Sequence, residues 1–307
     1  MIVRDKPNLL RLFFIMQGSI VPRVLPHLIF ISLLSISIVF VREHWPTRTF
    51  TFDGAPFSLV GIALSIFLGF RNSACYDRWW EGRKSWGQLA FCARDLSRKT
   101  LHLNELGTEA ADLRRSILQR SYQFAGALVS YLQPEGPFSP KGHVCADQTI
   151  NSDRANAGNP DAVLKLIARD LVDLRMRDIL TDHDYRMLHD TVAEMARVQV
   201  ICERLKNTPL PFGYTLLLHR TAYAFCFLIP FGFADTLGWG TPVVTALIAY
   251  TFFGLDALGD ELEDPLGCHP NTLAIRSIAS NIELEIKIDI GETELPDMPR
   301  VVDHVLV

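Results

Sequence analysis

The sequence lacks the short motifs by which many enzymes and metal-binding folds are recognised. It contains no glycine-rich phosphate loop, no His-Glu-x-x-His and no Gly-x-Ser-x-Gly. Its six cysteines include no Cys-x-x-Cys pair, so neither a zinc ribbon nor a disulfide framework is indicated. The formal net charge of -4 gives no reason to expect a nucleic-acid partner. We therefore expect a protein that is not an enzyme and that needs no cofactor.

One weak metal candidate lies in residues 134–160, a segment rich in Pro, Gly, Asn and Asp that is typical of a long loop. Its "HVCAD" stretch places His143, Cys145 and Asp147 together, and these side chains could capture a soft metal ion. Clusters this short are usually incidental, so the sequence leaves the metal content unknown.

Apolar residues, in contrast, make up 49% of the chain and are concentrated in long runs. Four such runs cover residues 24–41, 55–70, 214–234 and 238–255. A helix needs about 20 apolar residues to cross a hydrocarbon layer about 30 Å thick. We predict an all-α integral membrane protein with four membrane-spanning helices. The alternative is a large soluble α protein in which these runs are buried helices.

Basic residues set the expected orientation, because cytoplasmic flanks carry the positive excess. They gather before the first run and after the second, and few lie between the paired runs. Both termini and the middle of the chain are therefore expected in the cytoplasm, and no small-residue cleavage site follows the first run. The predicted parts are an N-terminal segment with the first hairpin (1–71, spans about 24–41 and 55–71), a helical cytoplasmic region (72–212), a second hairpin (213–258), and an acidic motif, helix and tail (259–307).

The cytoplasmic region shows apolar residues at three- and four-residue spacing, which is typical of amphipathic helices. Thr181 is a candidate N-cap, because acidic residues follow it in the first turn. Trp79, Trp80 and Trp86 follow the second run and are candidate anchors at the membrane interface.

The second run carries a distinctive ridge. Ile62, Ile66 and Phe70 recur at four-residue spacing, so on a helix they form one apolar stripe. A neighbouring stripe of small residues, Gly61, Ser65 and Gly69, allows close approach of another membrane helix. Spacing alone leaves two interpretations open: the ridge faces lipid or the protein core, or it lines a pore.

Three long stretches resemble the bacterial branch of the bestrophin family. They are "GFRNSACYDRWWEGRKSWG" (69–87), "CERLKNTPLPFGYTLLLHR" (202–220) and "GLDALGDELEDPLG" (254–267). The resemblance implies a homopentameric ion channel of the bacterial inner membrane, with a central pore lined by the second membrane helix of each subunit. It also implies that Ile62, Ile66 and Phe70 form the pore neck, a hydrophobic constriction that gates by dewetting.

Two departures from the family bear on the ion. Animal bestrophins are anion channels with phenylalanine at the middle position of the neck, where this chain has Ile66. An aromatic edge is electropositive and favours an anion, whereas isoleucine has no such edge. We therefore predict conduction of monovalent cations such as sodium, with a chloride or other anion channel as the alternative. A non-conducting membrane scaffold and a membrane enzyme are the rival classes.

The second departure lies in the acidic motif, Asp260, Glu261, Glu263 and Asp264. Calcium requires six to eight oxygen ligands, and the acids that follow this motif in animal bestrophins are absent here. We therefore predict weak or absent calcium control. The four acids either attract cations or pair with nearby bases at a helix end.

Two further expectations concern single positions. The family has a second constriction at the cytoplasmic mouth, for which Ile179 and Leu180 are candidates because they are bulky apolar residues at a predicted helix end.

His219 and Arg220 interrupt the third run, where charge is costly in lipid, so they should face protein or water. Packing against a neighbouring helix is the preferred role for them.

Overall fold

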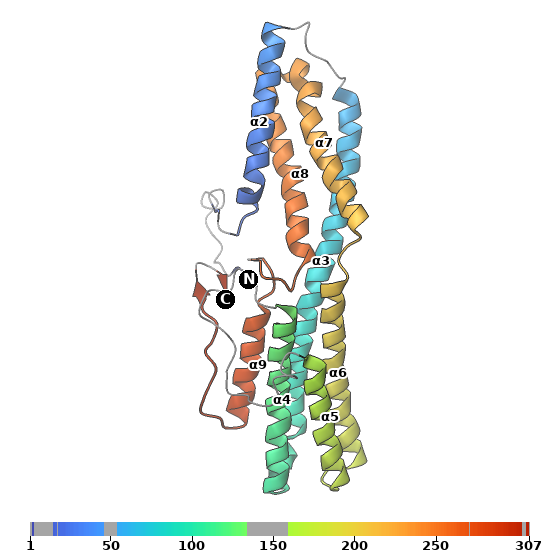
Figure 1. Cartoon of the computed structure of the whole chain (residues 1–307), viewed down its shortest axis with the longest axis vertical. Helices are drawn as coiled ribbons and strands as arrows, with labels where there is room; N and C mark the ends of the chain where they lie inside the picture. The colour runs from blue at the N-terminus through green and yellow to red at the C-terminus, as the bar shows by residue number, and fades with distance from the viewer. Residues whose placement is uncertain are drawn as a thin grey trace. The chain divides into compact units, whose positions relative to one another are not determined.

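The structure is a computed structural model. It describes residues 2, 15–16, 18–45, 54–133, 159–269, 271–302 and 305–306, apart from the side chains of residues 55, 302 and 305. The described residues are helical except for connecting segments and one short β hairpin, as the all-α prediction requires (Figure 1).

The elements follow one another in the order α2 (Val21–His44), α3 (Gly54–Lys99), η2 (Leu101–Glu105), α4 (Thr108–Leu132), α5 (Pro160–Met176), α6 (Asp182–Asn207), α7 (Phe212–Leu237), η3 (Gly238–Gly240), α8 (Thr241–Glu263), α9 (Ile275–Asp289), β1 (Val301–Val302) and β2 (Val305–Leu306). The two strands pair antiparallel, with Val301 opposite Leu306. The chain divides into two compact units that share α3.

The first unit, called here the apolar unit, comprises Asp5–Trp79 and Pro209–Asp264. It contains α2, the first part of α3, α7 and α8. Its core consists of buried aliphatic and aromatic side chains such as Leu68, Ile229 and Phe253. Helices α7 and α8 lie side by side and run in opposite directions, with η3 as the turn between them (Figure 1).

Three described helical segments are long and apolar enough to cross a membrane: Val21–His44, Pro56–Glu105 and Phe212–Glu263. The third is continuous through η3 and contains both α7 and α8. It therefore holds two of the four runs from which four spans were predicted. The second extends well beyond its apolar run because α3 does not end at the charged band after Phe70.

The second unit, called here the polar unit, comprises Met1–Arg4, Trp80–Thr208 and Pro265–Val307. The last part of α3 packs there with α4, α5, α6 and α9 around buried residues that include Phe124 and Trp86. Trp86 is completely buried, so the expectation that it anchors the chain at a membrane interface is wrong. Its indole fills the core of this unit instead.

Helix starts in the polar unit follow local sequence signals. The Thr181 hydroxyl accepts a hydrogen bond from the Asp184 backbone N–H, and the Asp184 carboxylate accepts one from the Thr181 backbone N–H. This reciprocal capping box satisfies two amide groups at the start of α6 and confirms the predicted N-cap. At the start of α5, the Asn159 side chain accepts from the Asp161 backbone N–H, and Pro160 occupies the first turn.

Candidate functional site

The ridge on α3 is exposed in the single chain. Ile62, Ile66 and Phe70 expose 60, 52 and 65% of their surfaces. Two residues further along, a rotation of about 200° on a helix, Leu64 and Leu68 are buried against the rest of the apolar unit. The ridge therefore points away from the core of its own subunit, which argues against the interpretation that it packs inside the chain.

The whole apolar part of α3 shares this exposure. In its most apolar 18-residue stretch only 17% is buried, compared with 28% in α2 and 44% in the α7–α8 segment. Burying apolar surface is the main driving force of packing in water, and close van der Waals contact is the main one in lipid. This face of α3 is therefore built to contact something outside the single chain.

The small-residue stripe contacts α7 at one end. A Cβ atom on Gly61 would lie 3.0 Å from Cζ of Phe225, so the glycine permits close approach of the two helices. The Ser65 hydroxyl donates to the Gly61 carbonyl at 2.8 Å. A Cβ atom on Gly69 would meet nothing within 4 Å in the described part of the chain. The stripe thus packs within the subunit only at its beginning.

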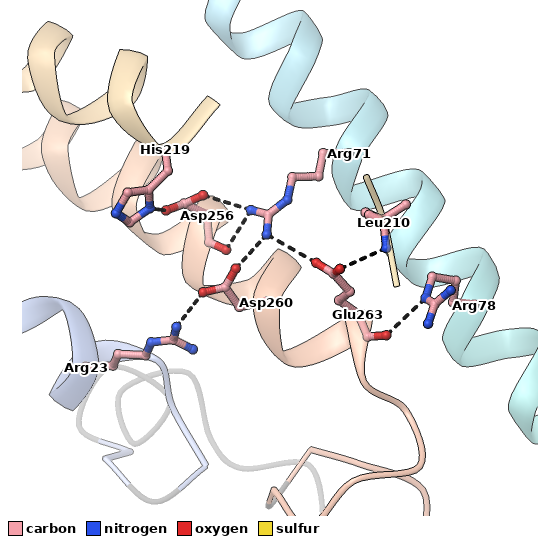
Figure 2. A network of polar contacts seen from close by, with 8 residues as sticks. All are labelled: Arg23, Arg71, Arg78, Leu210, His219, Asp256, Asp260 and Glu263. Atoms are coloured by element: carbon pink, nitrogen blue, oxygen red, sulfur yellow. Dashed lines mark hydrogen bonds and ion pairs between the residues drawn. The ribbon is translucent and has the colours of Figure 1, made fainter. Parts of the chain in front are cut away.

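Directly after the ridge, a buried charge cluster joins α3 to α8 (Figure 2). The Arg71 side chain is fully buried, and its guanidinium lies 2.8 Å from Asp256, 2.5 Å from Asp260 and 3.6 Å from Glu263. These four residues are called here the Arg71 cluster. The acids follow one another at four- and three-residue spacing and so share one face of α8. Together they compensate a charge that would be very costly to bury alone.

Neighbouring groups complete the cluster from three other places (Figure 2). Arg23, near the start of α2, donates to Asp260. The Leu210 backbone N–H, just before α7, donates to Glu263 Oε1 at 3.0 Å, and Arg78 Nε donates to the Glu263 carbonyl at 3.0 Å. The cluster therefore links α2, α3 and α8 to one another and to the segment just before α7.

His219 contributes the link to α7. Its Nδ1 lies 2.7 Å from Asp256 Oδ2 (Figure 2). The His219 ring lies 4.4 Å from the Tyr223 ring between centroids. This confirms that His219 packs against a neighbouring helix. Arg220, the next residue, is exposed.

A glycine allows α8 to approach this cluster. A Cβ atom on Gly259 would lie 2.6 Å from Asn72 Oδ1 and 3.1 Å from Arg71 Nη1. Atoms do not normally come that close, so any larger residue would push α8 away from α3 or displace the guanidinium. Gly259 is thus part of the site although it carries no functional group.

The acidic motif is largely engaged by bases. Asp260 binds Arg71 and Arg23, and Glu263 binds Arg71 and the Leu210 amide. Glu261 is partly buried, and Asp264 is exposed at the C-terminal end of α8. The interpretation that these acids pair with nearby bases therefore holds for Asp260 and Glu263. Attraction of cations by the motif stays a prediction.

The two candidates for a cytoplasmic constriction lie in the turn between α5 and α6. Leu180 is 1% exposed and packs inside the polar unit, whereas Ile179 keeps part of its surface accessible. A buried side chain cannot line a passage, so Leu180 is dropped from the prediction. Ile179 remains the candidate.

A metal site finds no support among the described residues, and the buried Cys202 does not suit thiol chemistry. They contain no group of three or more His, Cys, Asp or Glu side chains placed to hold a metal ion. His143, Cys145 and Asp147 lie outside the described residues. Burial raises the pKa of the Cys202 thiol to about 12, so this group is neutral at physiological pH and a poor nucleophile.

The partners of Arg71 were not identified from the sequence, although a signal existed. Asp256 directly follows the fourth apolar run, and Arg71 directly follows the second. Ionisable residues within membrane helices normally pair with one another. That rule, with the spacing of Asp256, Asp260 and Glu263 on one helix face, indicated that these acids pair with a base, although it did not specify which base.

Comparisons with known proteins agree on the family. The family model described as "Bacterial/Fungal Bestrophin protein" matches residues 1–288. A protein of Mesorhizobium japonicum named a voltage-dependent anion channel-forming protein is 40% identical over 299 residues, which is 97% of this chain and 95% of that protein. YneE of Escherichia coli K12, which has the same descriptive name, is 35% identical over 298 residues, which is 96% of each chain.

A solved structure supports the same relationship. The crystal structure of a bacterial bestrophin homologue from Klebsiella pneumoniae matches with a TM-score of 0.79 and 33% sequence identity. The match covers 88% of this chain and 100% of that chain. Sequence and structure agree over nearly the whole length, and the chain therefore belongs to the bacterial and fungal bestrophin family.

Proposed function

We propose that this protein is an ion channel of the bacterial inner membrane, assembled from five copies of the chain. The observation that carries the proposal is the exposed ridge of Ile62, Ile66 and Phe70 on α3, whose apolar stretch is the least buried of the three described segments of membrane length. In a pentamer, each ridge residue would contribute five side chains to one apolar ring. The polar unit and both termini would lie in the cytoplasm, and lipid would surround the remaining spans.

Such a neck controls conduction through hydration. These three rings of apolar side chains offer an ion no polar group in exchange for its hydration shell. A narrow neck of this kind therefore loses its water and stops conducting ions. The Arg71 cluster follows Phe70 directly and holds α3 against α8, so it would fix the height and rotation of the ridge.

The proposed ion is a monovalent cation such as sodium. Ile66 supplies no electropositive edge at the middle of the neck, and only Phe70 retains an aromatic ring there. Anion conduction, chloride included, is the second candidate, and the names of the curated relatives favour it, since they are called anion channel-forming proteins. Neither candidate requires a cofactor or a nucleic-acid partner.

The reversal potential of the purified protein in planar bilayers, under a sodium chloride gradient, tests the proposal. We expect the wild type to reverse near the sodium equilibrium potential. Ile66→Phe should move the reversal towards chloride, because it adds five aromatic edges to the neck. Val60→Phe is the matched control, since Val60 is an exposed residue of α3 outside the ridge, and it should leave the reversal unchanged.

The other outcomes separate the alternatives. A wild-type reversal near the chloride equilibrium potential would reject the cation and support the anion channel. Absence of current from correctly assembled protein would reject the channel and favour a membrane scaffold or a membrane enzyme. Equal shifts in Ile66→Phe and Val60→Phe would show that the ridge does not set selectivity.

A further inference from the structure

The apolar unit contains a cavity that the proposed conduction path does not use. It has a volume of about 540 Å³ and lies between α2 and α7, with Phe253 of α8 at its back. Its walls include His27 and Phe30 of α2 and Ala224 of α7. This volume is within the usual range for small-molecule sites.

The cavity is lined almost entirely by apolar groups. The His27 ring, its main polar component, packs edge-on against Tyr223 at 5.3 Å between centroids and lies 5.8 Å from Phe253. Phe30 and Phe227 line the cavity and also expose 59 and 42% of their surfaces. The cavity is therefore open on the outer surface of helices that are apolar enough to cross a membrane, and its lining suits a hydrocarbon chain.

A positive charge lies one helical turn from this opening. Arg220 precedes Ala224 by four residues, so the two residues share one face of α7. Within the described part of the chain, Arg220 is exposed and has no hydrogen-bond or ion-pair partner. An arginine without a partner on a membrane helix is costly unless an anion or the headgroup layer accommodates it.

The position of Arg220 suits the headgroup layer. It follows the first residue of α7 by eight positions, which is about 12 Å along the helix axis. Long helical side chains lean towards the N-terminus of their helix and extend their charge towards the membrane surface. The guanidinium is thus directed towards the start of α7, while the cavity begins one turn deeper.

We propose that this cavity binds one acyl chain of an anionic phospholipid whose phosphate pairs with Arg220. The apolar walls select the chain, and the unpaired arginine selects the negative headgroup. In the proposed orientation the start of α7 is cytoplasmic, so the lipid comes from the cytoplasmic leaflet. The inference depends on insertion of the apolar unit into a membrane and not on conduction.

The test is lipid retention by the purified, assembled protein. The protein is incubated with equal amounts of phosphatidylglycerol and phosphatidylcholine in mild detergent and repurified by size exclusion. Bound lipid is then quantified by mass spectrometry. We expect the wild type to retain phosphatidylglycerol over phosphatidylcholine by about fivefold, the preference that one basic residue near the surface provides.

Two variants divide the site into its parts. Ala224→Trp fills the cavity from an exposed position and should lower retention of both lipids. Arg220→Gln should bring the ratio of the two lipids close to one and leave phosphatidylcholine retention unchanged. Leu247→Trp is the matched control, because Leu247 is an exposed apolar residue of α8 outside the cavity lining, and it should behave as the wild type.

The opposite results overturn the proposal. Wild-type retention of both lipids by Ala224→Trp would show that the cavity is not the site. A wild type without bound lipid, combined with a changed oligomer mass in Ala224→Trp, would show that a second copy of the chain fills the cavity. If Ala224→Trp does not assemble, Ala224→Leu replaces it. None of these readouts needs a current, so they remain valid if the channel proposal fails.

Discussion

The two units of this protein expose different kinds of surface. The apolar unit buries Arg71 and Asp256 while it exposes large side chains such as Leu33 and Leu247. The polar unit buries side chains such as Phe124 and keeps many ion pairs near its surface, for example Lys165 with Asp161. In water, exposed apolar surface is unfavourable and exposed charge is well solvated; in lipid, both preferences reverse.

The comparison shows how the contribution of an ion pair depends on its burial. In the polar unit, an exposed pair is screened by water and contributes little. In the apolar unit, the same chemistry is shielded from solvent, so loss of one partner leaves a buried charge without compensation. The stability of the apolar unit should therefore depend strongly on Arg71, and that of the polar unit should depend little on its exposed pairs.

Removal of the buried arginine should have the largest effect. Arg71→Met leaves Asp256, Asp260 and Glu263 without their shared partner and should lower stability by about 3–5 kcal/mol. In the polar unit, Arg94→Met breaks the half-exposed pair with Glu285 and should cost less than about 1 kcal/mol. Thermal unfolding of the purified protein in detergent measures the difference.

Two additional variants keep this experiment decisive. Arg71→Lys retains the charge but loses the planar fork of donors, so it should melt between the wild type and Arg71→Met. Adding Asp256→Asn to Arg71→Met should recover part of the loss, because it removes one uncompensated acid. Equal melting temperatures for Arg71→Met and Arg94→Met would contradict the contrast between the two units.

An added methyl group should have an intermediate effect. Gly259→Ala places a Cβ atom 2.6 Å from Asn72 Oδ1, so we expect destabilisation of about 1–3 kcal/mol. In the polar unit, a Cβ atom on Gly126 of α4 would meet nothing within 4 Å in the described part of the chain. Gly126→Ala should therefore stabilise the protein by up to about 1 kcal/mol, because alanine is the better helix former. Melting temperatures that shift in the same direction would contradict this prediction.

The pH dependence of the Arg94–Glu285 pair should be the smallest effect. The hydrogen bond from Arg94, with its charge, lowers the pKa of Glu285 below the ordinary value of 4.5. A lowered pKa stabilises the fold above the ordinary value, and this stabilisation is lost as pH falls through the lowered value. The difference in melting temperature between the wild type and Arg94→Met should therefore be present at pH 7 and shrink below pH 4.5. The control is the same comparison in a Glu285→Gln background, where residue 285 cannot ionise. There, the difference in melting temperature caused by Arg94→Met should not change with pH.

Features of this structure that depend on local sequence patterns were predictable from the sequence. Helical periodicity, apolar runs of bilayer length and the Thr181 cap are local patterns, and each has its counterpart in the structure. The spacing also predicted that Ile62 and Ile66 share one helix face, but it did not show that this face is exposed and that the face of Leu64 and Leu68 is buried.

Contacts between distant segments were harder to predict from the sequence. Trp86 is of a residue type that often anchors helices at a membrane interface. However, α3 continues past its apolar run and brings the Trp86 indole into the core of the polar unit. Arg71 and Asp256 are 185 positions apart, and nothing local specifies which acid meets which base. Gly259 is likewise required by the position of a partner helix, which the sequence around it does not disclose.

The spacing of acids along α8 has a mechanical consequence. Asp256, Asp260 and Glu263 form a ladder whose rungs lie about one helical turn apart. The Arg71 guanidinium lies close to all three carboxylates at once, so a shift of α3 along α8 in either direction lengthens some of these contacts. Because a buried charge that loses its compensation is costly, the ladder resists sliding of α3 in both directions. The ladder therefore holds α3 at one height along α8, and with it Phe70, the neighbour of Arg71.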